Sequence, residues 1–103
     1  MITLRIGTET RALADASESW ITDQLNRRRG DGQPVCVEVA INTSGLNLRL
    51  ATAACGGTGG GGRAPNANEA RIFELWESKG LSSDRFTGGE VVAFLKQLRR
   101  LTA

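Results

Sequence analysis

The chain has 103 residues, which is enough for a single domain with one modest hydrophobic core. Thirteen basic and eleven acidic residues leave a formal net charge of +2, too small an excess to indicate a nucleic-acid-binding protein. Histidine and tyrosine are absent, which excludes Ser-His and Cys-His nucleophile pairs and almost every ordinary zinc site.

The first thirty residues predict a strand followed by a helix. Apolar and polar residues alternate over 2–6, as in a half-buried strand, and Gly7 ends this pattern. Apolar residues then recur at helical spacing over 8–29. Two helix starts are open: a threonine N-cap at position 8 or 10, or a capping box formed by Asp15 and Glu18.

A β-hairpin is the clearest pattern in the chain. Apolar residues alternate over 35–41 and again over 46–50, and a turn-forming Asn-Thr-Ser-Gly segment separates the two runs. With positions 43 and 44 as the loop, the apolar residues share one face and Glu38 lies opposite Arg49, so this register is preferred. A loop at positions 44 and 45 keeps the faces but removes the charge pair, and it ranks second.

The preferred register also predicts that the two cysteines do not form a disulfide. Cys36 faces Ala51, and Cys55 lies four residues further along the same face. An extended chain would place the two cysteines roughly 13 Å apart, too far for a disulfide. Cys36 is then a small side chain on the second face of the sheet. A reactive Cys55 whose pKa Arg63 lowers is a disfavoured alternative, because no histidine is present to serve as its base.

Two helices are predicted in the last third of the chain. The first covers 67–79 with Asn66 and Glu69 as its cap pair, and Gly80 and Leu81 predict a Schellman end. Its expected buried stripe is Ile72, Phe73, Leu75 and Trp76, while Glu69, Glu74 and Glu77 are expected on its solvated surface. The second helix begins at a Thr-x-x-Glu capping box over 87–90, and its apolar stripe is Val91, Phe94, Leu95, Leu98 and Leu101. Core packing is the expected role of both tryptophans, Trp20 and Trp76.

These elements predict an α+β fold in one domain, with a three-stranded sheet and its helices packed on one face. The order is β-α-β-hairpin over 1–55, a glycine-rich loop over 56–65 and a helical pair over 66–103.

The glycine-rich loop is the first candidate site. It follows a strand and precedes a helix, where backbone N–H groups bind anions in other folds. Gly57, Gly59 and Gly62 match a dinucleotide-binding spacing, but Arg63 stands where a P-loop needs lysine, and no βαβ unit follows. We therefore favour a flexible tether over an ordered anion-binding loop, and both over a nucleotide site.

A basic patch is the second candidate site. Arginines gather at the ends of two predicted helices, and they would form one surface if these ends lay together: Arg27, Arg28, Arg29, Arg99 and Arg100. The ordinary explanation is that helix C-termini favour cations. Anion or nucleic-acid binding through the loop and these arginines is therefore kept as an alternative.

The uncovered face and edges of the sheet give the leading functional hypothesis. The residues of this face are small or polar: Thr3, Arg5, Cys36, Glu38, Ala40, Asn47, Arg49 and Ala51. An open face or edge offers a docking surface to another chain. We expect a non-enzymatic interaction or accessory module with an unknown protein partner and without metal, cofactor or membrane span. A phosphate-handling enzyme is the least favoured alternative, and the lack of a signal-peptide pattern predicts a cytoplasmic location.

Overall fold

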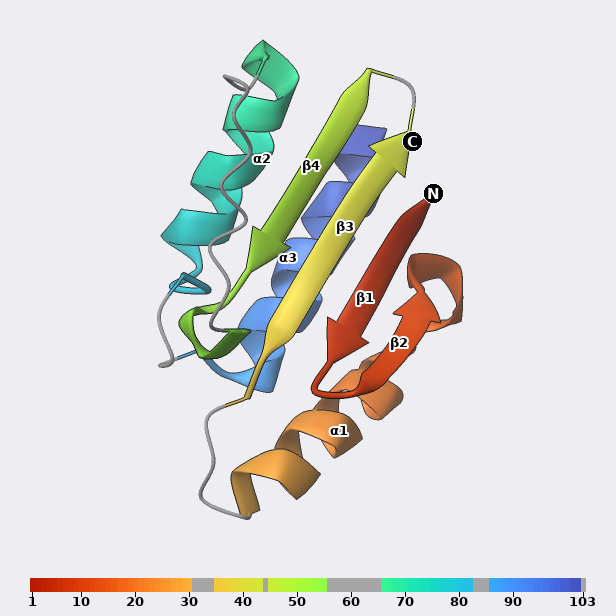
Figure 1. Cartoon of the computed structure of the whole chain (residues 1–103), viewed down its shortest axis with the longest axis vertical. Coiled ribbons are helices and arrows are strands. Elements are labelled where there is room, and N and C mark those ends of the chain that lie inside the picture. Colours follow the sequence, from red (N-terminus) through yellow and green to blue (C-terminus); the bar gives the residue numbers. More distant parts are fainter. Residues whose placement is uncertain (31–34, 44, 56–65, 83–85, 103) are drawn as a thin grey trace.

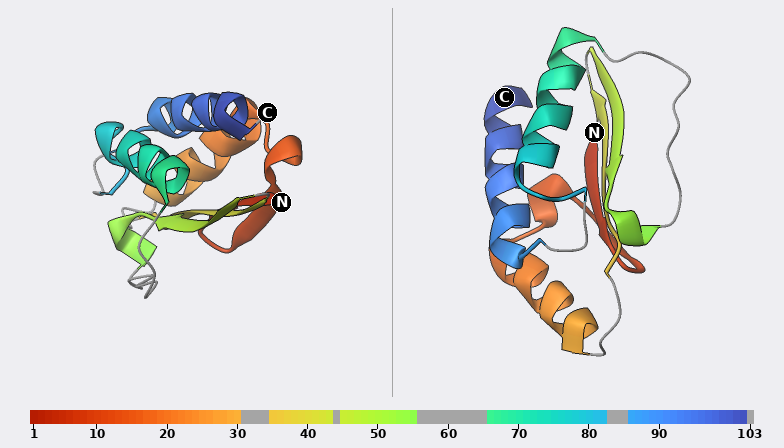
Figure 2. Two further views of the ribbon diagram at one scale, coloured as in Figure 1. Left: turned by 90° about the horizontal axis from the view of Figure 1, so that it is seen from above. Right: turned by 90° about the vertical axis from the view of Figure 1, so that its left-hand side faces the viewer.

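A computed structural model describes residues 1–30, 35–43, 45–55, 66–82 and 86–102, except for the side chains of residues 29 and 30 (Figure 1). Its elements, with η for a 3-10 helix, are β1 (Ile2–Ile6), β2 (Glu9–Ala12), η1 (Leu13–Asp15), α1 (Glu18–Gly30), β3 (Val37–Thr43), β4 (Leu46–Ala51), η2 (Ala53–Cys55), α2 (Ala67–Ser78) and α3 (Gly88–Thr102). The strands form an antiparallel sheet in the order β2-β1-β3-β4. The three α-helices pack on one face of this sheet, which confirms the predicted α+β class (Figure 2).

Strand β2 was not predicted, so the sheet has four strands and not the expected three. A tight turn at Gly7 and Thr8 reverses the chain, and Glu9 pairs with Ile6 where a helix was expected. Gly7 has a φ of 63°, in the left-handed region that glycine adopts without strain. Three of the four β2 residues are exposed, so the strand has no buried face for an alternating pattern to reveal.

The first helix consequently starts later than either predicted N-cap allows. Ser17 caps α1, because its Oγ accepts a hydrogen bond from the Trp20 N–H at 3.1 Å. The Ser17 carbonyl accepts the first helical bond, from the Ile21 N–H at 3.0 Å. The chain between β2 and this cap forms η1, whose Leu13 is buried.

The hairpin has the second-ranked register. Thr43 pairs with Leu46, so the loop consists of positions 44 and 45, and Ala40 rather than Glu38 lies opposite Arg49. Two-residue hairpin turns require a positive φ, and Gly45, with a φ of 78°, meets this requirement only inside the loop. Arg49 and Glu38 still form a salt bridge. They are diagonal neighbours across the two strands, and the arginine side chain is long enough to reach Glu38 from its place opposite Ala40.

The predicted caps of α2 are confirmed. The Asn66 side chain accepts a hydrogen bond from the Glu69 N–H at 2.8 Å, and the Glu69 carboxylate accepts one from the Asn66 N–H at 3.0 Å. At the other end the Leu81 N–H donates to the Trp76 carbonyl at 3.3 Å, which is the Schellman bond, and Gly80 has a φ of 73°.

The predicted start of α3 is confirmed, with the glutamate half of its capping box. The Glu90 carboxylate accepts a hydrogen bond from the Thr87 N–H at 3.0 Å. The Thr87 carbonyl accepts the first helical bond, from the Val91 N–H at 3.3 Å.

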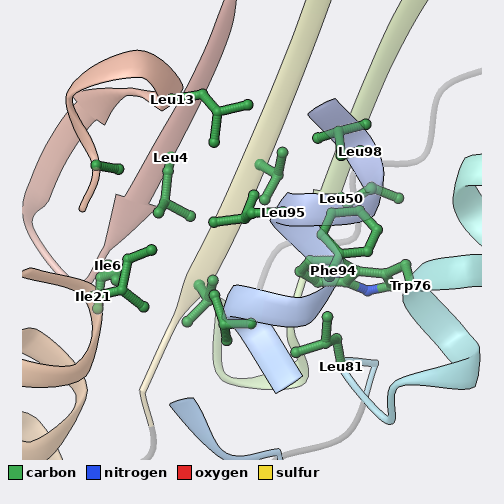
Figure 3. Close-up of a cluster of buried hydrophobic side chains, with 14 of the residues drawn as sticks. Leu4, Ile6, Leu13, Ile21, Leu50, Trp76, Leu81, Phe94, Leu95 and Leu98 are labelled. Atoms are coloured by element: carbon green, nitrogen blue, oxygen red, sulfur yellow. The ribbon is translucent and has the colours of Figure 1, made fainter. Parts of the chain in front are cut away.

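The core lies between the sheet and the helices. Trp76 and Phe94 meet edge to face with ring centroids 5.2 Å apart, and Leu81 and Leu50 lie beside them (Figure 3). Two predicted core positions are wrong, since Phe73 is 43% exposed and Leu101 is 51% exposed. Trp20 is only partly buried. It packs below the Arg11 guanidinium, which lies 4.5 Å from the ring centroid.

Replacement of Gly7 by alanine is expected to lower the free energy of unfolding by about 1–2 kcal/mol, because alanine is strained at a positive φ. A Cβ at this position would also lie 2.2 Å from the Arg28 Cζ, so the guanidinium would have to move. Urea titration followed by circular dichroism measures the change. Gly89→Ala is the control, since Gly89 lies in α3 with only an ordinary contact at 3.7 Å and should be neutral or stabilising. Equal losses in both variants would contradict the conformational explanation.

Candidate functional site

An apolar groove lies at the end of the sheet where β1 begins and β3 turns into β4. Two cavities of about 660 and about 340 Å³ adjoin there and share Thr43 and Thr102 in their walls. We call this surface the end groove, and its main apolar residues are Met1, Ile2, Leu46 and Leu101. Met1 and Leu101 are two of the three large hydrophobic side chains exposed among the described residues. Exposed apolar residues gathered in a concave surface are typical of binding sites.

The charge around the end groove is positive. Arg71 on α2 borders the smaller cavity and Arg99 on α3 borders the larger one, and the described residues that line the two cavities include no aspartate or glutamate. The Arg99 Nη2 donates a hydrogen bond to the Leu13 carbonyl at 2.9 Å, which fixes this guanidinium at the wall. Within the described part of the chain, Arg71 forms no salt bridge. The groove therefore combines apolar walls with a basic rim.

The open face of the sheet carries a three-residue ion network. Glu38 accepts hydrogen bonds from the Nη2 atoms of Arg5 at 3.0 Å and Arg49 at 2.5 Å. Burial alone would raise the pKa of Glu38, but these bonds outweigh it and hold the pKa below its ordinary value. The hydrogen bond to Glu38 likewise raises the pKa of Arg49. The strand residues of this face include no aromatic side chain, so the face offers no platform on which a nucleic-acid base could stack.

The ion network makes stability depend on pH. The Glu38 pKa is lowered on folding, so its contribution is present above the unfolded-state pKa and is lost as the pH falls through the folded-state pKa. From about pH 5 downward, the free energy of unfolding should therefore fall more steeply in the wild type than in Glu38→Gln. Denaturant titrations at a series of pH values measure both slopes. Parallel curves for the two proteins would contradict the prediction.

The two edges of the sheet, which were expected to be docking surfaces, are both protected. At the β4 edge the Asn47 N–H donates to the Glu69 carboxylate at 2.8 Å, and the Asn66 side chain donates to the Gly45 carbonyl at 2.9 Å. Glu69 is only 1% exposed, so its predicted place on the solvated helix surface is wrong. Strand β2 is four residues long and carries Glu9 and Arg11. Short, charged or covered edges are poor templates for a further strand.

Cys36 and Cys55 form a disulfide, so the predicted separation is wrong. Their Cα atoms lie 4.5 Å apart. The prediction assumed an extended chain to Cys55, but β4 ends at Ala51 and the chain turns back through η2. Thr52 holds this turn, because its buried Oγ1 accepts from the Val37 N–H at 3.0 Å and donates to the Val35 carbonyl at 3.2 Å. The apolar alternation stops at Leu50, and this is the one sequence signal for the end of the strand.

The four predicted anion-binding residues lie outside the described part of the chain: Gly57, Gly59, Gly62 and Arg63.

The arginines of the predicted basic patch are not brought together. Helices α1 and α3 are antiparallel, because Lys96 pairs with Glu18 at 2.8 Å while Gly88 lies against Leu25. The two arginine groups therefore lie at opposite ends of this helix pair (Figure 1). Arg27 pairs with Asp23 at 3.1 Å, Arg28 donates to the Thr8 Oγ1 at 3.3 Å, Arg99 and Arg100 end α3, and the Arg29 side chain lies outside the described part.

Comparisons with family models, with curated proteins and with solved structures found no match for this chain. The described residues hold no group of three or more potential metal-binding side chains. Among the described helices, none has the length and apolar character needed to cross a membrane. Among the described surfaces considered above, the end groove is the one that combines concavity, exposed apolar side chains and unbalanced charge.

Proposed function

We propose that the protein is a non-enzymatic interaction module whose end groove binds an apolar segment of a partner protein flanked by acidic side chains. The observation that carries the proposal is Leu101, a leucine on the last turn of α3 that is 51% exposed at the wall of a cavity. Its neighbours across the groove, Leu46 and Ile2, are partly buried and pack against the core. The groove floor is therefore continuous with a rigid, packed interior.

The chemistry of the partner follows from the rim. Arginine beside buried apolar side chains is characteristic of the centres of protein interfaces. Arg71 and Arg99 border the groove, and no acidic side chain stands beside them among the described lining residues, so acidic side chains on the partner would complement them. Such complementarity contributes mainly to partner choice and to the rate of association.

Leu101→Asn should weaken binding of such a segment by about tenfold or more, because loss of one buried leucine contact is worth at least about 1.4 kcal/mol. Peptides are first selected on the wild-type protein from a random display library, and their affinities are then measured by fluorescence anisotropy. The asparagine is neutral, so the charge at the end of α3 is unchanged.

Phe73→Asn is the matched control, because Phe73 is the other large hydrophobic side chain exposed on a helix and it does not line the groove. Selected peptides are expected to be rich in leucine, isoleucine or phenylalanine together with aspartate or glutamate, and to bind the control as tightly as the wild type. Equal affinity for Leu101→Asn, or no enrichment of any peptide, would overturn the proposal.

Anion or nucleic-acid binding through the glycine-rich loop and the helix-end arginines stays an alternative. The separation of the arginines and the open face without aromatic residues lend it no support. It predicts that a short DNA duplex binds and that the affinity falls steeply between about 50 and 200 mM salt. A phosphate-handling enzyme stays the least favoured class.

A cytoplasmic location stays part of the proposal, and cell fractionation tests it. It bears directly on the disulfide, because thiol reductants keep most cytosolic cysteines reduced.

A further inference from the structure

We propose that Cys36 and Cys55 form a reversible redox site, opened by low-molecular-weight thiols of the glutathione class, in which Arg5 stabilises the Cys36 thiolate that leaves. This inference is independent of the proposed function, since neither cysteine lines the end groove. Its basis is the position of a guanidinium and a disulfide side by side at the end of the open face.

Access and charge distinguish this disulfide from a buried structural one. Cys36 and Cys55 are both half-buried, so a small thiol can reach the bond. The Arg5 Nη2 lies 3.5 Å from the Cys36 Sγ, within contact distance. A guanidinium at this distance stabilises a thiolate.

The second contact of Arg5 places the guanidinium. Arg5 is the fourth of the five residues of β1, and its Nη2 also donates to the Glu38 carboxylate at 3.0 Å. Glu38 is in turn held by Arg49 from the neighbouring strand. Arg5 is therefore fixed next to Cys36 before the bond opens. No such group lies against Cys55 among the described residues.

The reaction follows from this asymmetry. A glutathione thiolate attacks the Cys55 Sγ, a new sulfur–sulfur bond forms there, and the Cys36–Cys55 bond breaks. Cys36 leaves with the electron pair as a thiolate beside Arg5, which is the favoured direction because the better-stabilised thiolate is the better leaving group. A second glutathione thiolate then attacks the glutathione sulfur on Cys55. This step yields glutathione disulfide and a Cys55 thiolate, which takes a proton from water, so the protein gains two electrons.

The turn between β4 and η2, which brings Cys55 close to Cys36, is held by hydrogen bonds as well as by the disulfide. Thr52 joins η2 to the start of β3 through three hydrogen bonds, one from its own N–H and two at its Oγ1. The reduced thiols would therefore remain near each other, as re-oxidation requires.

The test measures the rate at which excess reduced glutathione opens the disulfide in the native full-length protein at neutral pH without oxygen. Samples are quenched with acid, the thiols are alkylated, and tandem mass spectrometry locates the glutathione adduct. Arg5→Gln is expected to slow the opening about three- to tenfold, and Arg5→Lys to restore part of the rate, because lysine keeps the charge. The transient adduct is expected on Cys55.

Arg100→Gln is the control, since it removes an exposed arginine in the last turn of α3, on the helix-covered side of the sheet, and belongs to neither the ion network nor the surroundings of the cysteines. Its rate should equal that of the wild type. Equal rates in Arg5→Gln and Arg100→Gln, or an adduct found mainly on Cys36, would overturn the role of Arg5. A disulfide that opens only after the protein is unfolded in denaturant would overturn the redox site itself.

Discussion

Replacement of Trp76 by alanine is expected to lower the free energy of unfolding by about 3–5 kcal/mol. The side chain is 1% exposed, and it joins α2 to α3 through its edge-to-face contact with Phe94. Leu81, which follows the Schellman turn and is fully buried, lies beside the Trp76 side chain. Truncation removes a large apolar side chain and leaves a cavity between α2, α3 and the turn that carries Leu81. The backbone cannot easily move to close this cavity.

Urea titration followed by circular dichroism is the measurement, because the substitution removes one of the two tryptophans that fluorescence would report. Domains of this size are typically stable by only 5–15 kcal/mol, so a variant that does not fold is replaced by Trp76→Phe, whose expected loss is smaller but of the same sign. Trp20→Ala is the control. Trp20 is partly buried, and its Arg11 contact contributes about 0.5–1 kcal/mol. Equal losses from the two alanine variants would contradict the central place of Trp76.

The features that were predicted correctly are those whose information is local. Asn66 and Glu69 lie three residues apart, and their reciprocal hydrogen bonds need nothing beyond the first turn of α2. The Schellman end at Gly80 and the start of α3 at Thr87 are equally local. The faces of the hairpin were also predictable, because both candidate registers place the same apolar residues on the same side.

The features that were missed depend on contacts between distant segments. Strand β2 is exposed and short, and it exists because Gly7 turns the chain back onto β1. The two hairpin registers differ in whether the loop is 43–44 or 44–45. The preferred one was chosen because it places Arg49 opposite Glu38, but Arg49 pairs with Glu38 in the observed register as well, where the two residues are diagonal neighbours. The end groove has no sequence signal, since it joins the start of β1, the hairpin and the last turn of α3.

The disulfide gives the second large effect. Its removal in a Cys36→Ala/Cys55→Ala variant is expected to lower the free energy of unfolding by about 3 kcal/mol, the loop-closure entropy for cysteines 19 residues apart. Urea titrations of the wild type with and without a dithiol reductant, and of the double variant, measure it. The reductant should lower the midpoint of the wild type to that of the variant and leave the variant unchanged. A wild-type midpoint that does not move would show that the unfolded chain gains no freedom when the bond opens.

This stability change and the redox equilibrium of the cysteines are two sides of one thermodynamic cycle. If the bond stabilises the fold by about 3 kcal/mol, the folded chain must favour the disulfide over the dithiol about 150-fold more than the unfolded chain does. The ratio is accessible from glutathione equilibria measured in buffer and in high urea. Arg5 acts on the folded side of the cycle alone, because its position beside Cys36 exists only when β1 is paired with β3. Arg5→Gln should therefore raise the ratio by destabilising the folded dithiol, while the equilibrium in urea stays the same. A change of equal size in both solvents would mean that Arg5 does not act through the folded contact.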